Sequence, residues 1–469
     1  MRVAIVGGGV AGLTAAWHLH EAGLSPVVLE AGDAVGGLVQ TIDLAGRRLE
    51  LGADTLVTQK PAAVHLCRRI GLGGDLVFQD AGATRVLLRG RLRALPAGTS
   101  PLAVVRWRSL LRSRLFSWRG VLRLALEPRV PAVRDPAHDE SLASFFSRRF
   151  GREMLEVFAE PVLASLFLAD AERLSMRLAL PRLLEAERIH GSVRRALAQA
   201  AQPGRPHGGS GGFATLRGGL GTLPRRLAAV LPRGTVRLNA AVDHVRREGE
   251  AFLVALASGE RVLADGVVLA CPAHRAAAVV PPLDPQLAEE LSALEASSCA
   301  AVHLVFRRQD VQGEIAGHGF FVPRSAGLPL LACSYVSEKY PERARPGDLI
   351  VRAFVGGARN PHALEGSDEE LVAQTQRALA PVLQPRAMPV LAHVQRHVRA
   401  MPHFVVGDAA RLTRMAARTQ AQGPIVLAGA LRGAVGVPDV VASAGAAADE
   451  LIAVLRQRRT PALPRAAAE

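Results

Sequence analysis

The fold of this chain is decided by one stretch near its N-terminus, Arg2-Val3-Ala4-Ile5-Val6-Gly7-Gly8-Gly9-Val10-Ala11-Gly12. It begins as a short apolar strand and turns through glycines into a helix with apolar residues at helical spacing. Gly7 permits the tight turn, Gly9 lets the backbone approach a pyrophosphate, and Gly12 lets the helix pack closely on the strand. The helix N-terminus offers N–H groups and a positive dipole end to phosphates. The stretch therefore predicts a dinucleotide site.

A second strand, Pro26 to Glu30, follows this helix and ends in an acid. Glu30 lies 18 residues after Gly12, close to the expected spacing of about 20. Its carboxylate would accept hydrogen bonds from ribose hydroxyls and repel a 2′-phosphate. Gly36-Gly37 then resembles the ExxxRxGGR signature of the flavin amine oxidase superfamily, which favours FAD over NAD. Ala34 and Leu38 replace the arginines of that signature, so the pyrophosphate charge is left to backbone amides and to a second segment.

That second segment lies near the C-terminus. Ile425 to Ala430 reads as a buried strand ending at glycine, and Gly433 and Gly436 follow it. Residues 441–448 are small and helical in pattern, which allows close approach of the helix N-terminus to a phosphate or a flavin ring. The alternative is a tightly packed helix of small residues without a ligand. A single flavin would require both ends of the chain to fold together.

Composition narrows the class of protein. The chain has 469 residues, of which 49% are hydrophobic and 21% charged, so it can bury a large core or two lobes. Its formal charge is +15, but only two of its 57 basic residues are lysines and only 4% of residues are aromatic, so no nucleic-acid partner is expected. The four cysteines form no CxxC pair, which indicates reduced thiols, no metal site and a cytoplasmic location. No apolar stretch is long enough to predict a transmembrane helix.

The pattern along the chain predicts an α/β protein with three domains. We expect a Rossmann-like FAD-binding domain from residues 1–90, 206–295 and 406–469, a helical cap or membrane-type domain over 91–205, and an α+β substrate domain over 296–405. Strands are expected within 84–95, 235–245, 261–270, 300–306, 330–337, 349–356 and 390–397. A capping box at Ser367 to Glu370 opens a further helix. Residues 201–212 are rich in glycine and proline and are expected to form a mobile loop.

Residues 102–126 mix arginines with Val, Leu and aromatic residues. This amphipathic and basic segment is interpreted in two ways, as a monotopic membrane contact or as an ordinary helical cap over a core.

Several stretches together resemble the oxygen-dependent protoporphyrinogen/coproporphyrinogen oxidase family, and the resemblance covers nearly the full chain. Besides the glycine turn, they are residues 51–56, 89–96, 174–175, 216–224, 354–359 and 432–439. The resemblance implies that FAD takes a hydride from a meso carbon of a porphyrinogen and that O2 reoxidises the flavin, which gives H2O2. It also implies that the protein mainly positions the reactants and excludes water.

The matching motifs imply which residues of this chain would form the family's binding site. Those expected to hold FAD are Gly7, Gly9, Val10, Ala11, Gly12, Glu30, Ala31, Gly36, Gly37, Leu38, Gly52, Ala53, Asp54, Val242, Gly429, Val435, Gly436 and Val437. Val242 would contact adenine through its backbone, while 52–54 and 435–437 would border the flavin ring. The substrate pocket would be lined by Phe167, Ala169, His318, Phe321 and Phe354. No catalytic acid or base is named. Lys339 is interpreted in two ways, as a residue near the flavin or as a solvated lysine at a strand end, and the second is expected.

The sequence departs from the family pattern at three further places. A small basic residue that some members have after the Ala-Leu-Pro turn is replaced around Thr99-Ser100. The family usually has glycine where Ala169 stands, and its Gln-Tyr-x-x-Gly-His pattern reads His403 to Asp408 here. The expected reaction is oxidation of protoporphyrinogen IX to protoporphyrin IX in heme biosynthesis. Coproporphyrinogen III oxidation, another flavin oxidase or desaturase activity, and flavin binding without turnover remain open, as do contact with the inner face of the membrane and a homodimer.

Overall fold

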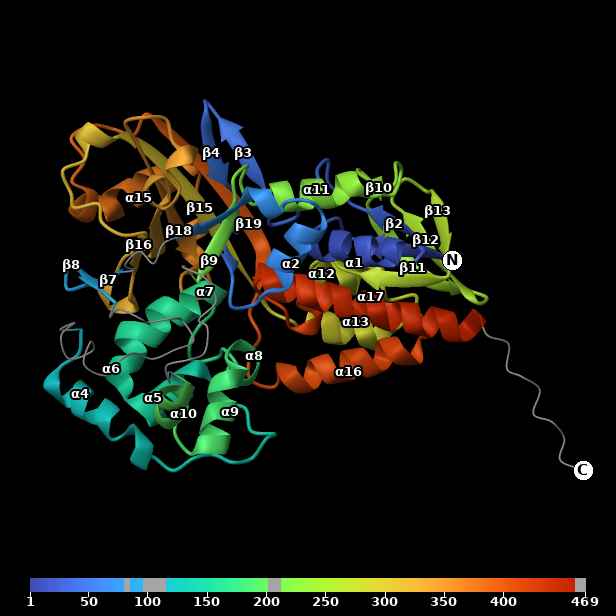
Figure 1. Ribbon diagram of the computed structural model, residues 1–469, viewed down its shortest axis with the longest axis horizontal. Coiled ribbons are helices and arrows are strands. Elements are labelled where there is room, and N and C mark those ends of the chain that lie inside the picture. Colours follow the sequence, from blue (N-terminus) through green and yellow to red (C-terminus); the bar gives the residue numbers. More distant parts are fainter. Residues whose placement is uncertain (80–84, 96–114, 201–211, 460–469) are drawn as a thin grey trace, which may run out of the picture.

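A computed structural model describes residues 1–79, 85–95, 115–200 and 212–459 (Figure 1). Its first sheet is parallel, with strand order β10-β2-β1-β14-β20. The strands are β1 (Arg2–Val6), β2 (Ser25–Leu29), β10 (Val236–Arg237), β14 (Gly266–Leu269) and β20 (Ile425–Leu427). Strands from the start, the middle and the end of the chain therefore pair in one sheet. The mixed α/β fold expected from the sequence is confirmed.

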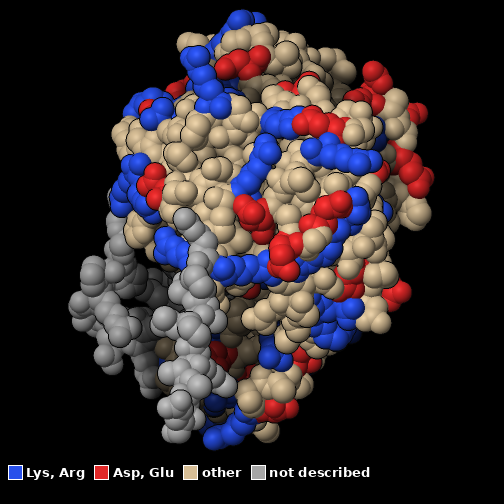
Figure 2. All heavy atoms as spheres, turned by 90° about the vertical axis from the view of Figure 1, so that its right-hand side faces the viewer, with Lys and Arg blue, Asp and Glu red and all other residues tan. Residues whose placement is uncertain are grey.

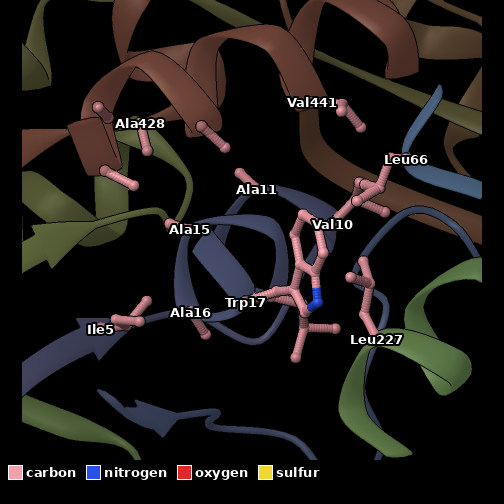
Figure 3. Close-up of a cluster of buried hydrophobic side chains, with 14 of the residues drawn as sticks. Ile5, Val10, Ala11, Ala15, Ala16, Trp17, Leu66, Leu227, Ala428 and Val441 are labelled. Atoms are coloured by element: carbon pink, nitrogen blue, oxygen red, sulfur yellow. The ribbon is translucent and has the colours of Figure 1, made fainter. Parts of the chain in front are cut away.

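Helices cover one face of this sheet because its strands are apolar on both faces. They are α1 (Val10–Glu21), α2 (Ala62–Arg69), α11 (Thr222–Val230) and α17 (Val437–Arg459). Their shared core contains Trp17 and Ala11 of α1, Leu227 of α11 and Val441 of α17, which Figure 3 shows around the first turns of α1. Figure 1 shows α1 and α17 side by side, although they lie at opposite ends of the sequence.

The other face carries a three-stranded antiparallel sheet and three helices. These are β11 (Val242–Glu248), β12 (Ala251–Leu256), β13 (Arg261–Ala264), α12 (Ala273–Val279), α13 (Pro285–Ser292) and α16 (Asp408–Ala421). Two expected strands, 235–245 and 261–270, are each divided here, which corrects the prediction. The first is interrupted around Asn239, whose φ is 53°. The second is divided at Asp265, whose N–H donates to the carbonyl of Arg2 where the chain passes from one sheet to the other.

A seven-stranded sheet forms the second large body, with strand order β19-β15-β18-β17-β16-β7-β8. Its strands are β7 (Arg85–Leu88), β8 (Arg91–Ala94), β15 (Ala296–Arg307), β16 (Gly319–Phe321), β17 (Leu330–Tyr335), β18 (Asp348–Gly356) and β19 (Leu391–Pro402). Helix α15 (Asp368–Leu383) packs on it and opens with the predicted capping box. The hairpin around Gly90 joins this sheet through parallel pairing of β7 with β16, so the expected boundary at residue 90 falls inside it.

Short strands connect the two bodies, and a helical cap lies beside the larger sheet (Figure 1). The strands are β3 (Thr41–Leu44), β4 (Arg47–Glu50), β5 (Leu56–Val57), β6 (Leu76–Gln79) and β9 (Phe213–Leu216). The cap contains α4 (Trp118–Ala125), α5 (Leu142–Phe150), α6 (Arg152–Met154), a π-helical segment Leu155–Ala164, α7 (Ser165–Phe167), α8 (Met176–Ala179), α9 (Pro181–His190) and α10 (Val193–Ala200). The helical pattern expected over 101–200 is confirmed from residue 115 onward. Residues 102–114, and residues 201–211 of the loop expected at 201–212, lie outside the described residues.

The charged residues are distributed over the molecule. Positive and negative side chains are interspersed on the face shown in Figure 2. Several arginines pair with acids, such as Arg432 with Glu450 at 2.7 Å. In the part of the chain that the structure describes, no helix is long and apolar enough to cross a membrane. The four cysteines are free thiols, as expected.

Candidate functional site

The glycine turn between β1 and α1 is the first part of the site. Gly7 has a φ of 107°, and a Cβ there would lie 2.9 Å from the carbonyl oxygen of Ala270. A Cβ on Gly12 would lie 1.9 Å from the carbonyl oxygen of Gly7, so the close approach of helix and strand requires glycine. Gly9 is different, because a Cβ there would meet no heavy atom within 4 Å. No atom of the chain therefore occupies the space beside Gly9, and a pyrophosphate site requires such open space.

Residues after β2 close one side of this turn. The Glu30 carboxylate accepts hydrogen bonds from Gly8 N at 2.6 Å and Gly32 N at 2.9 Å. Gly36 forms an isolated bridge with Gly9, and its N–H donates to the carbonyl of Gly8 at 2.9 Å. The chain leading to Val242 at the start of β11 also lies here, since Ala240 N donates to Glu30 O at 2.8 Å. The structure thus brings the glycine turn, Glu30, Gly36 and the start of β11 together.

The C-terminal segment closes the opposite side. A Cβ on Gly429 would lie 2.8 Å from the Cβ of Ala11, so the two backbones approach closely only because residue 429 is glycine. Val437, the first residue of α17, is buried in the same core as Val10 and Ala11. Figure 3 shows Ala428 and Val441 above Ala11. The two ends of the chain therefore meet at the glycine turn, as the sequence required.

A third segment, residues 50–55, runs beside Leu38. A Cβ on Gly52 would lie 1.9 Å from the carbonyl oxygen of Leu38, which again leaves room only for glycine. The remaining predicted cofactor residues lie at the accessible margins of these segments: Ala31, Gly37, Leu38 and Gly436 are exposed, and Ala53, Asp54, Val242 and Val435 are half-buried.

Asp54 is the centre of a cluster of charged side chains between the two bodies. Its carboxylate lies 3.0 Å from Lys339 Nζ and 3.0 Å from Arg352 Nη2. Burial alone would raise the pKa of Asp54, but the positive charges of Arg352 and Lys339 hold that pKa far below its usual range. The expectation that Lys339 is solvated is wrong: α14 (Val336–Lys339) carries its side chain into the interface, where 13% of it is exposed.

Glu50 extends the cluster. Its carboxylate lies 2.9 Å from Arg343 Nη2 and accepts a hydrogen bond from Leu220 N at 2.8 Å. Burial raises the pKa of Glu50, although Arg343 offsets part of that effect. Arg352 Nη1 also donates to the carbonyl oxygens of Glu50 and Gly52, at 3.1 and 2.9 Å. The sequence did not predict Arg343 and Arg352 as site residues. Its available indication of the cluster was that two acids, Glu50 and Asp54, flank Gly52.

The predicted substrate residues lie where the cap meets the seven-stranded sheet. Phe167, Ala169 and Phe321 belong to the cap core or pack against it. Phe354 packs in a separate small cluster with Leu168, beneath the Arg352 guanidinium, which lies 4.7 Å from the ring centroid. His318 contacts the side-chain amide of Gln79. The five residues therefore occupy three neighbouring environments rather than one cluster.

A cavity of about 420 Å³ lies nearby, at the ends of β15 and β19, and none of these five residues lines it. His403, a departure from the family pattern, lines this cavity. Its ring forms hydrogen bonds with Ser297 Oγ at 2.8 Å and with Glu295 Oε2 at 3.0 Å.

A parallel sheet with a glycine turn, an acid after its second strand and a distant segment closing on the same turn defines a dinucleotide-binding oxidoreductase. The chain belongs to the family of flavin containing amine oxidoreductases, whose model matches residues 10–452. It is an oxidase-type enzyme and its cofactor is FAD. The open space at Gly9 and the close approach of Gly429 to Ala11 fit such a cofactor.

Known proteins resemble the chain over nearly its whole length. Coproporphyrinogen III oxidase of Bacillus subtilis is 29% identical, with 97% of this chain and 98% of the relative aligned. Chloroplastic protoporphyrinogen oxidase of Nicotiana tabacum is 28% identical, with 86% of this chain and 76% of the relative aligned. A crystal structure described as "Putative protoporphyrinogen oxidase" from Exiguobacterium sp. 255-15 is 30% identical and superposes with a TM-score of 0.84, covering 96% and 98% of the two chains. The resemblance seen in the sequence is confirmed.

Proposed function

We propose that this protein oxidises coproporphyrinogen III to coproporphyrin III in heme biosynthesis, with O2 as the electron acceptor and H2O2 as the second product. The meeting of both chain ends at the glycine cradle carries the flavin part of this proposal. The bacterial relative that aligns end to end supports coproporphyrinogen as substrate. Protoporphyrinogen IX, the substrate first expected from the sequence, is the second candidate, supported by the Nicotiana and Exiguobacterium proteins.

In this proposal each segment has a role toward FAD. The glycine turn holds the pyrophosphate, Glu30 the ribose and the backbone of Val242 the adenine. Residues 36–38, 52–54, 429 and 435–437 surround the flavin. When bound there, FAD would supply the chemistry that accepts hydride from the substrate and transfers electrons to O2. The FAD-binding domain then comprises the segments 1–90, 206–295 and 406–469 given above, apart from strand β7, which belongs to the seven-stranded sheet.

The chain positions the substrate and excludes water. We propose that the apolar macrocycle lies at the junction of cap and sheet, against Phe167, Ala169, Phe321 and Phe354, with His318 at its edge. Cap and sheet are joined there by backbone hydrogen bonds such as Ala358 N to Leu168 O at 2.9 Å. Such a junction keeps the reacting carbon in a fixed, water-poor position.

Purified FAD-loaded protein is expected to generate porphyrin fluorescence in air from coproporphyrinogen III faster than from protoporphyrinogen IX, with H2O2 formed in parallel. Both substrates should be compared in one experiment, with heat-inactivated protein as the control for spontaneous oxidation. Faster turnover of protoporphyrinogen would favour the second candidate. Enzymatic oxidation of neither substrate would remove the porphyrinogen proposal.

We further propose that helix α4 touches the inner face of the membrane. Trp118, Leu122 and Leu126 follow one another at helical spacing and are 72%, 52% and 38% exposed. Arginines on the same helix would suit anionic lipid headgroups.

Replacing Trp118 and Leu122 by serine is expected to weaken binding to anionic vesicles by roughly a hundredfold or more, because burying each such side chain contributes about 1.5–3 kcal/mol. Cosedimentation with phosphatidylglycerol-containing vesicles measures the effect. Val398→Ser, at an equally exposed position on β19, is the control and should bind as the parent does. Unchanged binding of the double variant would remove α4 from the contact.

A further inference from the structure

The charged cluster at Asp54 contains more positive than negative charge. Its cations are Lys339, Arg343 and Arg352, and its anions are Glu50 and Asp54. Arg343 pairs with Glu50, and Arg352 alone would balance Asp54, so Lys339 is the additional cation. The exposed fraction of each of these five side chains is 13% or less. Within the described residues, the cluster therefore holds one positive charge in excess.

Neighbouring titratable groups do not supply the missing negative charge. Burial and the charge of Arg352 lower the pKa of His303 on β15 to about 3, and the same causes lower the pKa of His397 on β19, so both rings are neutral at pH 7. Burial raises the pKa of the Tyr340 hydroxyl to about 12 and that of the Cys299 thiol to about 11. These groups come from β15, from β19 and from Tyr340, the residue that follows α14, and all are uncharged at neutral pH.

The arginines are also not saturated by the protein. Arg343 Nε and Nη1 and Arg352 Nε are buried and have no hydrogen-bond partner among the described residues. Each of these arginines has a carboxylate partner, but a buried donor of a charged group that makes no hydrogen bond still costs free energy. An anion that forms beside the cluster would lower the free energy of burying its excess positive charge.

The position of the cluster indicates which anion that is. Lys339 and Arg352 bind Asp54, and Arg352 binds the carbonyl of Gly52, so the excess charge is attached to residues 52–54. Under the proposed function these residues border the flavin ring. An oxidised flavin ring is uncharged, and it gains one net negative charge when it takes up two electrons and one proton. The dithionite or substrate that donates the electrons is oxidised in the same step.

We propose that Lys339 is a positioning residue that, through Asp54, supplies the buried positive charge which stabilises the reduced flavin. This inference rests on the proposed position of residues 52–54 beside the ring. Lysine suits the role because its ammonium is compact and can bind Asp54 and Thr55 from one point, at 3.0 and 3.5 Å. The chain otherwise uses arginine almost everywhere, and one of its only two lysines stands here.

The test is the midpoint potential of FAD-loaded protein, titrated with dithionite without porphyrinogen. Lys339→Met removes the excess cation and should shift the potential to a more negative value. We expect about a tenfold change in the reduction equilibrium, which is ~30 mV for a two-electron couple. Asp54→Asn removes a negative charge from the same pair and should shift the potential in the opposite direction. Lys339→Arg keeps the charge and should restore most of the parent value.

The opposite signs separate the charge from a structural role, because loss of the ion pair alone would affect both variants alike. Lys60→Met is the matched control, since Lys60 pairs with Asp439 where 38% of the side chain is exposed and solvent screens its charge. An equal shift in Lys60→Met, shifts of the same sign in the first two variants, or an unshifted Lys339→Met would overturn the inference. If Lys339→Met does not load FAD, the sign of the Asp54→Asn shift decides. None of these outcomes depends on which substrate the enzyme oxidises, so the porphyrinogen assay remains a separate test.

Discussion

Gly12→Ala is expected to destabilise the nucleotide-binding body by roughly 3 kcal/mol and to abolish retention of FAD, because the new Cβ would overlap the Gly7 carbonyl oxygen. That atom belongs to the backbone of the turn itself, so α1 has to move away from β1. Denaturant unfolding and the flavin absorbance of the purified protein measure the two effects. A Gly12→Ala protein with parental stability and full FAD content would contradict the packing described for this turn.

Gly9→Ala is the companion to this prediction. Its Cβ meets no protein atom, and Gly9 has a φ of −72°, so the protein without FAD should be as stable as its parent. The methyl group would instead occupy the space proposed for the pyrophosphate. We therefore expect FAD to bind at least tenfold more weakly, a loss of about 1.4 kcal/mol. Gly74→Ala, which also has open space and lies in a surface turn, should change neither quantity.

Arg149→Met should be the most damaging single change in the cap, at about 3–5 kcal/mol of unfolding free energy. The Arg149 guanidinium is fully buried and pairs with Glu127 and Glu187, and it also binds carbonyl oxygens of the surrounding turns. Without it, Glu127 would remain as a buried anion. Urea unfolding followed by far-ultraviolet circular dichroism, to which the helices of the cap contribute, measures the loss.

Two further variants identify the cause of this loss. Adding Glu127→Gln to Arg149→Met removes the uncompensated charge and should recover part of the stability. Arg152→Met, three residues along the chain, removes an arginine that is 85% exposed and should unfold as the parent does. If Arg149→Met and Arg152→Met were equally stable, burial of the ion pair would not explain the cap's stability.

The nucleotide-binding half was predictable because its determinants are local. A glycine turn, a small-residue helix and an acid after an apolar strand each act within a few residues of one another, so their spacing appears directly in the sequence. The same holds for the capping box at Ser367 and for the hairpin turn at Gly90, both of which the structure confirms. The sequence predicts one strand over 261–270 because the apolar run continues past Asp265. In the structure the strand is divided there, where the chain begins to pair with β1.

The charged cluster at Asp54 was not predictable in the same way. Lys339 and Arg352 stand far from residues 50–55 along the chain, in a sequence where arginine is common and each one reads as solvated. Only the packing of β18 and α14 against that segment removes these side chains from water and gives each a partner. The attachment of the hairpin 85–94 to the larger sheet depends likewise on β16, more than 220 residues later.

By itself the sequence determined the tight turn between β1 and α1, because a positive φ at Gly7 and close approach at Gly12 restrict those two positions to glycine. It also predicted a dinucleotide site at that turn. The sequence predicted as well that the C-terminal segment closes on this turn, and the structure places Gly429 against Ala11 there. The tertiary structure alone decided which charges are buried beside residues 52–54 and in what balance. Burial and electrostatic pairing depend on distance in space, and residue order does not encode that distance.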